Sequence, residues 1–149
     1  MLTVAEIMTR EPHTLGPDDS LASARRMMAE HHIRHIPVVS DDGNLIGLVS
    51  QRDVLAAEDS TVLNEAGGPD SRDQYVAISV IMTASVQTVE ENAGLRGTAM
   101  QMQKNKLGCL PVVNEGQLVG IITDSDFVSI AINLMEQLES TEPEEDEFD

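Results

Sequence analysis

The sequence predicts a mixed α/β (α+β) fold made of two β-α-β-β-α repeats, because the chain carries the same series of motifs twice. The phrase "GLVSQRD" that begins at Gly47 recurs as "GIITDSD" at Gly120, and "HIPVV", ending at Val39, recurs as "CLPVV", ending at Val113. A third pair, "IMTREPHTL" and "IMTASVQTV", precedes them. The offset is 113 − 39 = 74 residues, then 120 − 47 = 73, because "SDDG" is answered by the shorter "NEG". A true duplication tolerates one deletion in a turn.

The first copy contains the elements of one repeat in order. A short β-like piece surrounds Thr14 and Leu15, and "GPDDSLASARRMMAEHH" predicts an amphipathic helix, with a proline and capping residues ahead of apolar positions. Two β-like runs, "IPVV" and "LIGLV", flank "SDDGN", whose Asp-Gly pair predicts a hairpin, and Ser50 begins a second helix. The first two strands should be parallel, through a right-handed crossover, and the last two antiparallel.

The second copy follows the same order with two differences. Its first helix carries Gly94 and Gly97, each of which costs up to about 1 kcal/mol relative to Ala in a helix interior, so packing must compensate. Its last helix is longer and carries an apolar stripe that needs a partner surface. The stripe consists of Phe127, Ile130, Ala131, Leu134, Met135 and Leu138.

These patterns divide the chain into four parts. Residues 1–57 form the first repeat and residues 76–138 the second. Residues 58–75 are polar and contain Gly-Gly-Pro, which is typical of a linker. Residues 139–149 form an acidic tail with little apolar content, which we expect to be disordered.

The composition disfavours several partners and activities. The formal net charge of −17, from 26 acidic and 9 basic residues, repels phosphate backbones and anionic membranes, so we expect neither nucleic acid nor a membrane as a partner. The chain has no apolar run long enough for a membrane span and no signal-peptide pattern, and we expect a cytoplasmic protein. The single cysteine, Cys109, excludes an intramolecular disulfide. No nucleophile elbow, P-loop, metalloprotease or Rossmann motif occurs, so we expect no enzyme.

With these residues in view, the chain resembles the paired cystathionine β-synthase (CBS) domains, also called a Bateman module. The resemblance rests on "IMT", the Pro-Val-Val strands and the phrase Gly-x-x-(Ser/Thr)-x-x-Asp, each present in both copies. It implies two CBS repeats packed sheet to sheet about a pseudo-twofold axis. It also implies two clefts that hold an adenine nucleotide (AMP, ADP or ATP) or another adenosyl compound, such as S-adenosylmethionine, as a regulatory ligand rather than a required cofactor. A homodimer formed through the helices would suit the apolar stripe.

The repeated phrase has two interpretations. A carboxylate can accept hydrogen bonds from both hydroxyls of a ribose, while the hydroxyl residue three positions earlier and the NH groups of a helix N-terminus face the phosphates. Ser50-x-x-Asp53 and Thr123-x-x-Asp126 are equally good helix starts, with a hydroxyl cap and an acid in the first turn. Both interpretations stay open from these segments alone.

The family resemblance implies which residues meet in each cleft, since one repeat supplies the ribose and phosphate end and the other supplies the adenine end. The first cleft, here the Asp53 cleft, would pair Ser50, Arg52 and Asp53 with Thr83, Thr88, Leu107 and Gly108. The second, here the Asp126 cleft, would pair Thr123, Ser125 and Asp126 with Thr9, Thr14, Ile33 and Arg34.

The two predicted clefts differ in charge. Arg52 adjoins the carboxylate of the Asp53 cleft and Arg34 could lie near it, which favours a charged phosphate tail there. The phrase of the Asp126 cleft contains the acidic Asp124, which favours fewer phosphates or a neutral adenosyl ligand.

The leading hypothesis is a regulatory sensor, in which an adenosyl ligand biases the arrangement of the two repeats and an unidentified protein partner reads the change. A rival hypothesis is a ligand-free interaction module whose helices or acidic tail dock a partner. A weaker one uses His31, His32 and His35 as ligands of a metal-dependent hydrolase. We expect no metal, because the helix should end before Ile36 and no carboxylate or cysteine completes an obvious set.

Overall fold

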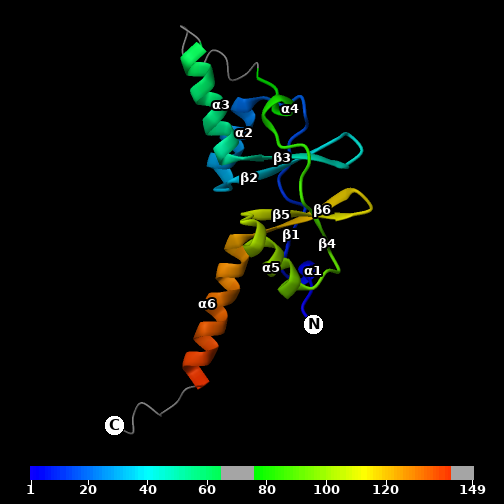
Figure 1. Cartoon of the computed structure of the whole chain (residues 1–149), viewed down its shortest axis with the longest axis vertical. Helices are drawn as coiled ribbons and strands as arrows, with labels where there is room; N and C mark the ends of the chain where they lie inside the picture. The colour runs from blue at the N-terminus through cyan, green and yellow to red at the C-terminus, as the bar shows by residue number, and fades with distance from the viewer. Residues whose placement is uncertain (65–75, 142–149) are drawn as a thin grey trace, which may run out of the picture.

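The structure is a computed structural model that describes residues 1–64 and 76–141. Its two halves are stacked along the long axis, with the strands of both halves side by side in the middle and the longest helices pointing to opposite ends (Figure 1). The elements of the first repeat are α1 (Val4–Ile7), β1 (Thr9–Arg10), α2 (Leu21–His31), β2 (His35–Val39), β3 (Leu45–Ser50) and α3 (Gln51–Asn64). Those of the second are α4 (Ile78–Ile81), β4 (Val89–Glu90), α5 (Leu95–Asn105), β5 (Cys109–Asn114), β6 (Gln117–Thr123) and α6 (Asp124–Thr141).

The predicted strand order and directions are confirmed in both repeats. The hairpins β2–β3 and β5–β6 are antiparallel, and β4 runs parallel to β5. In the first repeat, the equivalent parallel contact is a single bridge between Leu15 and Val38. The equivalent helices α2 and α5 end at equivalent positions, where His32 and Lys106 both adopt the left-handed conformation with φ of 54°.

The segment at the start of each repeat joins the sheet of the other repeat. β1 pairs antiparallel with β6, and Thr83, which follows α4, bridges to Leu48 on β3. Backbone bonds repeat the exchange, since Val4 NH donates to Ala93 O at 3.0 Å and the equivalent Ile78 NH donates at 2.8 Å to a carbonyl of the first repeat. The exchange ties the two halves together in both directions, since each half receives a segment from the other.

The two hydrophobic cores contain the exchanged segments. The core of the first half contains Ile78 with residues such as Leu21 and Ile36, and the core of the second half contains Val4 and Met8. Val4 and Ile78 are fully buried. Each half therefore depends on the other for part of its core, and this is the strongest structural reason to regard the two repeats as one unit.

The hairpin tips provide a second connection between the halves. Leu45 NH donates to Gly116 O and Leu118 NH donates to Gly43 O, both at 3.1 Å. Gln117 adds side-chain bonds from Nε2 to Asp42 O at 2.8 Å and to Asn44 Oδ1 at 2.9 Å.

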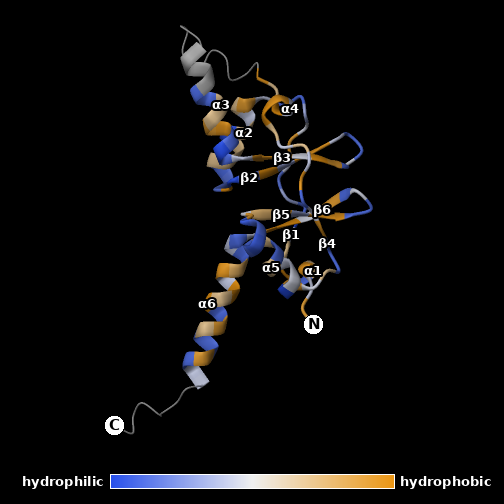
Figure 2. Cartoon of the chain, in the orientation of Figure 1, coloured by the Kyte–Doolittle hydropathy of each residue, from blue (hydrophilic) through white to orange (hydrophobic). Residues whose placement is uncertain are grey.

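The last helix lies only partly on the core. Phe127 and Ile130, at the start of the predicted stripe, pack against the second core, whereas Leu134, Met135 and Leu138 are between 55% and 65% exposed. Figure 2 shows apolar residues alternating with hydrophilic ones along this exposed part of α6. The first turns of α6 thus cover the second core, whereas the rest of its apolar stripe is exposed.

Two helices extend past the limits expected from the sequence. α3 continues through residues 58–64 of the segment predicted as a linker, and residues 65–75 lie outside the described residues. α6 continues to Thr141, and residues 142–149 of the predicted tail also lie outside them. Within the described residues, no helix is long and apolar enough to cross a membrane.

Candidate functional site

Each repeated phrase forms the junction between a strand and the helix that follows it. At the end of β3, Ser50 NH donates to Asp53 Oδ2 at 2.8 Å, and Asp53 NH donates to Ser50 Oγ at 3.1 Å. At the end of β6, Thr123 NH donates to Asp126 Oδ2 at 2.8 Å, and Thr123 Oγ1 lies 3.3 Å from the same oxygen. The first phrase is therefore a complete capping box, and in the second the carboxylate accepts from the backbone NH and the hydroxyl of Thr123, so the cap interpretation describes both helix starts.

The capping bonds use one carboxylate oxygen and leave the other. Every hydrogen bond that the side-chain carboxylate of Asp53 or Asp126 accepts from a described residue goes to its Oδ2 atom. A carboxylate has about four lone-pair sites on two oxygens, so Oδ1 can still accept bonds from a ligand. The cap and ligand interpretations are therefore compatible, and the cap fixes the carboxylate in place.

The glycine of each phrase permits the exchanged segment to approach. A Cβ built on Gly47 would lie 3.1 Å from Thr83 O, and a Cβ built on Gly120 would lie 2.9 Å from Thr9 O. A side chain at either position would push the neighbouring strand away. The same two threonines line the clefts, so each glycine helps to bring the other repeat to the cleft wall.

The Asp53 cleft has a volume of about 360 Å³ and combines residues of both repeats. Six of its seven predicted residues line it: Ser50, Arg52, Asp53, Thr83, Leu107 and Gly108. The seventh, Thr88, lies in a separate hollow of about 170 Å³ beside Val86 and Val113. The other lining residues, which were not predicted, are His35, Leu48, Ser85, Val86, Gln87, Lys106 and Cys109.

The Asp126 cleft is smaller, with a volume of about 230 Å³. Five predicted residues line it: Thr9, Ile33, Arg34, Thr123 and Ser125. Thr14 and Asp126 are not among its lining residues, although Asp126 is bonded to the lining residue Thr123. The unpredicted lining residues are Pro12, His13, His32, His35, Ile121 and Asp124.

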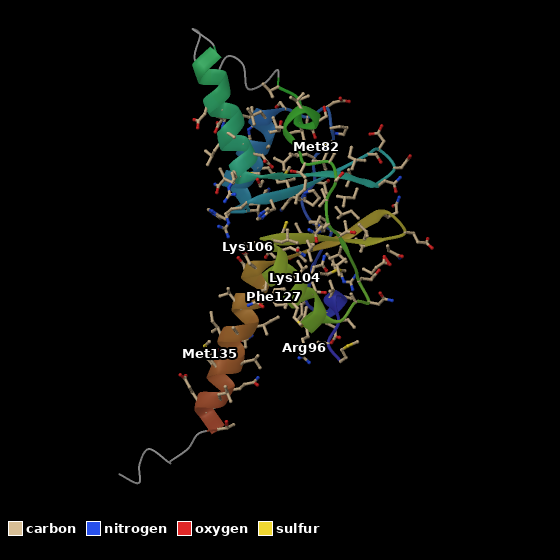
Figure 3. The ribbon with its side chains drawn as sticks, in the orientation of Figure 1. Met82, Arg96, Lys104, Lys106, Phe127 and Met135 are labelled. Atoms are coloured by element: carbon tan, nitrogen blue, oxygen red, sulfur yellow. The ribbon has the colours of Figure 1, made fainter. Side chains whose placement is uncertain are left out.

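An open hollow of about 700 Å³, here called the vestibule, shares lining residues with both clefts and adds Gln51 and Leu55. Its full lining is Arg34, His35, Ser50, Gln51, Arg52, Leu55, Lys106, Leu107, Gly108 and Asp124. Figure 3 places Lys106 at the level where the two halves meet. Lys106 could have been predicted, because it is the repeat equivalent of His32 and directly precedes the predicted Leu107.

The vestibule contains most of the charge around the clefts. Arg34 Nη2 lies 3.8 Å from Asp124 Oδ1, and both side chains are more than half exposed. Burial lowers the pKa of His35, and Arg34 lowers it further, against the opposing effects of Asp124 and Asp53. The imidazole is therefore neutral at pH 7 and can both donate and accept a hydrogen bond.

The remaining reactive side chains do not form a catalytic or metal-binding group within the described residues. Burial raises the pKa of Cys109 to about 12, so its thiol is protonated at neutral pH and is a poor nucleophile. His31 ends α2 and stacks on His13 with 3.7 Å between ring centroids, while His35 begins β2. In this part of the chain, no group of three or more His, Cys, Asp or Glu side chains could hold a metal ion.

The fold and the clefts define a class of protein, the paired-repeat modules in which two half-domains share clefts at their junction. The chain belongs to the CBS domain family, whose model matches residues 4–60 and 77–133. The match includes both repeated phrases and both exchanged segments.

Solved structures of CBS-pair proteins share the fold over nearly the whole chain. A Vibrio cholerae protein named for acetoin utilization is 46% identical, with a TM-score of 0.81, and the match covers 93% of this chain and 98% of that one. The CBS-pair protein CBSX2, crystallised with AMP, is 27% identical with a TM-score of 0.75, covering 91% and 99%. The CBS domain pair of protein MJ0100, crystallised with 5′-methylthioadenosine and S-adenosylmethionine, is 25% identical with a TM-score of 0.74, covering 89% and 98%.

Among curated relatives, the chain corresponds to a whole protein in one case and to a part in others. It is 31% identical over 136 residues to a CBS domain-containing protein of Dictyostelium discoideum, covering 89% of this chain and 93% of that one. It spans 21% of inosine-5′-monophosphate dehydrogenases from Mycobacterium and 24% of a homoserine O-acetyltransferase from Methanocorpusculum labreanum. CBS pairs thus occur both as nearly whole proteins and as parts of enzymes.

Proposed function

We propose that this chain is a regulatory module that binds an adenine nucleotide, or another adenosyl compound, in the clefts between its two repeats. The observation that carries the proposal is the composition of the Asp53 cleft, where a carboxylate held by a helix cap faces Thr83, Leu107 and Gly108 of the other repeat. A ligand that spans this cleft contacts both halves, so its binding depends on their relative arrangement.

The residues of the Asp53 cleft match the parts of a nucleotide. Asp53 Oδ1 can accept bonds from a ribose diol, and the apolar Leu107 and Val86 offer surfaces for adenine. The first turn of α3 and the basic Arg52 and Lys106 provide donors for phosphate oxygens. The ligands named in the structures of CBSX2 and MJ0100 support the choice of an adenosyl compound.

The charged lining residues differ between the two clefts, and Arg34, which the sequence suggested near the Asp53 cleft, lines the Asp126 cleft instead. Arg52 and Lys106 give the Asp53 cleft two cationic side chains, which suits AMP, ADP or ATP. Asp124 lies in the Asp126 cleft, which suits fewer phosphates or a neutral adenosyl group such as that of 5′-methylthioadenosine. We propose that the Asp53 cleft is the one that prefers a charged phosphate tail.

The proposed output is a protein contact and not a reaction. We propose that the module forms a homodimer through the exposed apolar side chains of α6, and that a further protein partner reads the ligand state. Leu134→Glu should then convert the dimer into a monomer in analytical ultracentrifugation, whereas Gln137→Glu, on the same exposed helix, should leave it dimeric. A cytoplasmic location, where adenine nucleotides are abundant, belongs to the same proposal.

The 46% identity to the Vibrio cholerae protein favours one process for that output. We propose acetoin utilization as the regulated process. Deletion of the gene should slow growth on acetoin but not on glucose. Equal growth of the mutant and its parent on acetoin would exclude this assignment.

Thermal unfolding with AMP, ADP, ATP, S-adenosylmethionine and 5′-methylthioadenosine tests the binding proposal. A ligand at one hundred times its dissociation constant stabilises the folded state by about 2.7 kcal/mol, which raises the midpoint by several degrees. Asp53→Asn keeps a side-chain acceptor for the cap but replaces one acceptor with a donor, so it should remove ribose binding and retain stability. Asp41→Asn, on an exposed turn, is the matched control.

The rival proposal of a ligand-free interaction module makes the opposite prediction. It expects that no ligand of the panel changes the midpoint of the wild type, so that the wild type and the Asp53→Asn variant respond alike to AMP. That pattern would favour protein docking by the helices over ligand sensing.

A further inference from the structure

We infer that Arg34 is shared between the two clefts, so that an anionic ligand bound in one cleft weakens the binding of a second anionic ligand in the other. This inference rests on the proposed function, because it concerns ligands bound in those clefts. It adds a regulatory property: the two clefts are coupled through charge.

The position of Arg34 supports sharing. Its side chain lines the Asp126 cleft and the vestibule, and the vestibule shares six of its ten lining residues with the Asp53 cleft, which Arg34 does not itself line. The Arg34 side chain is 61% exposed, and its Nη2 lies 3.8 Å from Asp124 Oδ1, a distance at which an exposed ion pair is weak. Arg34 can therefore leave Asp124 for a phosphate on either side without a large loss.

The internal symmetry of the repeats gives the Arg34–Asp124 ion pair no charged counterpart at the equivalent positions. The repeat equivalents of Arg34 and Asp124 are Gly108 and Gln51, and neither is charged. The backbone confirms the equivalence, since Gln51 NH donates to Arg34 O at 2.8 Å and Asp124 NH donates to Gly108 O at 2.9 Å. All four residues line the vestibule, and Arg34 is the only cationic side chain among them.

The other basic side chains of the vestibule lie on the side of the Asp53 cleft. Arg52 and Lys106 line that cleft and the vestibule but not the Asp126 cleft, which leaves Arg34 as the cation that the vestibule and the Asp126 cleft have in common. Besides Arg34, the basic residues of the Asp126 cleft are the histidines His13, His32 and His35, and burial lowers the pKa of His35, so this one adds little positive charge at pH 7. The fixed positive charge of the Asp126 cleft therefore comes from Arg34 alone among its lining residues.

A ligand in one cleft then changes the charge of the other. When Arg34 turns toward a phosphate in the Asp53 cleft, the carboxylate of Asp124 is no longer neutralised and opposes an anion in the Asp126 cleft. When Arg34 binds an anion in the Asp126 cleft, the vestibule loses a cation. Coupling between sites is reciprocal, and for exposed charges we expect its lower range, about fivefold in affinity. A ligand without phosphate should show no coupling.

Calorimetric titration of the full chain with AMP and with adenosine measures the coupling. Asp53→Asn and Asp126→Asn each leave one cleft, and each gives the association constant of that cleft alone. The coupling factor is the overall two-ligand constant of the wild type divided by the product of these two constants. Arg34→Gln removes the shared charge, and Arg26→Gln, exposed on α2, removes the same charge away from the clefts.

We expect a coupling factor of about 0.2 for AMP in the wild type and in Arg26→Gln, and a factor of about 1 for adenosine and for AMP in Arg34→Gln. A factor of 1 for AMP in the wild type would overturn the inference while leaving the proposed function intact. A factor of 0.2 that persists in Arg34→Gln, or one cleft that binds AMP in no variant, would also overturn it. Failure of the wild type to bind either ligand would instead overturn the proposed function.

Discussion

Replacing Gly47 by alanine should destabilise the protein by forcing an exchanged strand away from β3. The added Cβ would overlap the sulfur of Met82 and lie 3.1 Å from Thr83 O. The methionine side chain can move, but Thr83 O accepts the bond from Leu48 NH at 3.0 Å, so the backbone itself must shift. Insertion of a methyl group into such a tight contact typically costs about 1–3 kcal/mol.

The size of the change can be compared with that at other glycines. At about 3 °C per kcal/mol for a domain of this length, Gly47→Ala should lower the unfolding midpoint by about 3–9 °C. Gly120→Ala should behave alike, because its Cβ would lie 2.6 Å from Met8 Sδ. Gly97→Ala is the control with the opposite sign: no atom lies within 4 Å of its Cβ, and alanine in α5 should add about 0.5–1 kcal/mol.

Thermal unfolding followed by circular dichroism at pH 7.5 would measure all three variants. AMP binding should also weaken in Gly47→Ala, because Thr83 lines the Asp53 cleft. A midpoint for Gly47→Ala within 1 °C of the wild type, together with a higher midpoint for Gly97→Ala, would refute the argument that the exchanged strand requires a glycine beneath it.

Three further predictions test other parts of the account. Burial lowers the pKa of His35 below 6.5, so the contribution of this histidine to stability is present above pH 6.5 and is lost as the pH falls below that value. His35→Gln should therefore flatten the decline of the unfolding midpoint between pH 6.5 and 5.5, and an unchanged decline would contradict this. Cys109, with a pKa of about 12, should react with a thiol reagent at pH 7.5 only as fast as the protein unfolds, and rapid labelling of the native protein would argue against its burial. Ile78→Ala should cost about 2–5 kcal/mol in urea unfolding, whereas Val80→Ala, 76% exposed on the same helix, should cost under about 0.5 kcal/mol; equal effects would contradict the cross-repeat core.

The sequence predicts the elements of each repeat well because their signals are local. The Asp-Gly turn, the alternation of apolar residues and the capping phrases all act within a few residues, and the hairpins and helix starts follow them. The exchange of leading segments has no local signal. The motif "IMT" is the same in both copies, so either sheet could accept either segment, and only the tertiary arrangement decides between them.

The same limit applies to the clefts. The repeated phrase identifies the capped carboxylates, and the family resemblance leads to most of the lining residues. Thr14 and Thr88, which occupy equivalent positions, are absent from the lining of both clefts, and each directly precedes a residue, Leu15 or Val89, that makes a parallel contact with a strand of its own repeat. His35, which begins β2, and Lys106, which ends α5 in the left-handed conformation, also line the vestibule. His35 belongs to none of the repeated site motifs, whereas Lys106 could have been predicted from its place next to Leu107.

The most direct test of the central claim is calorimetric titration of AMP into the wild type and into the double variant Asp53→Asn, Asp126→Asn. The account predicts saturable binding to the wild type and none to the double variant, with unfolding midpoints within about 2 °C of each other because asparagine preserves both caps. Absence of binding to the wild type, or equally tight binding to the double variant, would contradict the claim that these capped carboxylates read the ribose of an adenosyl ligand.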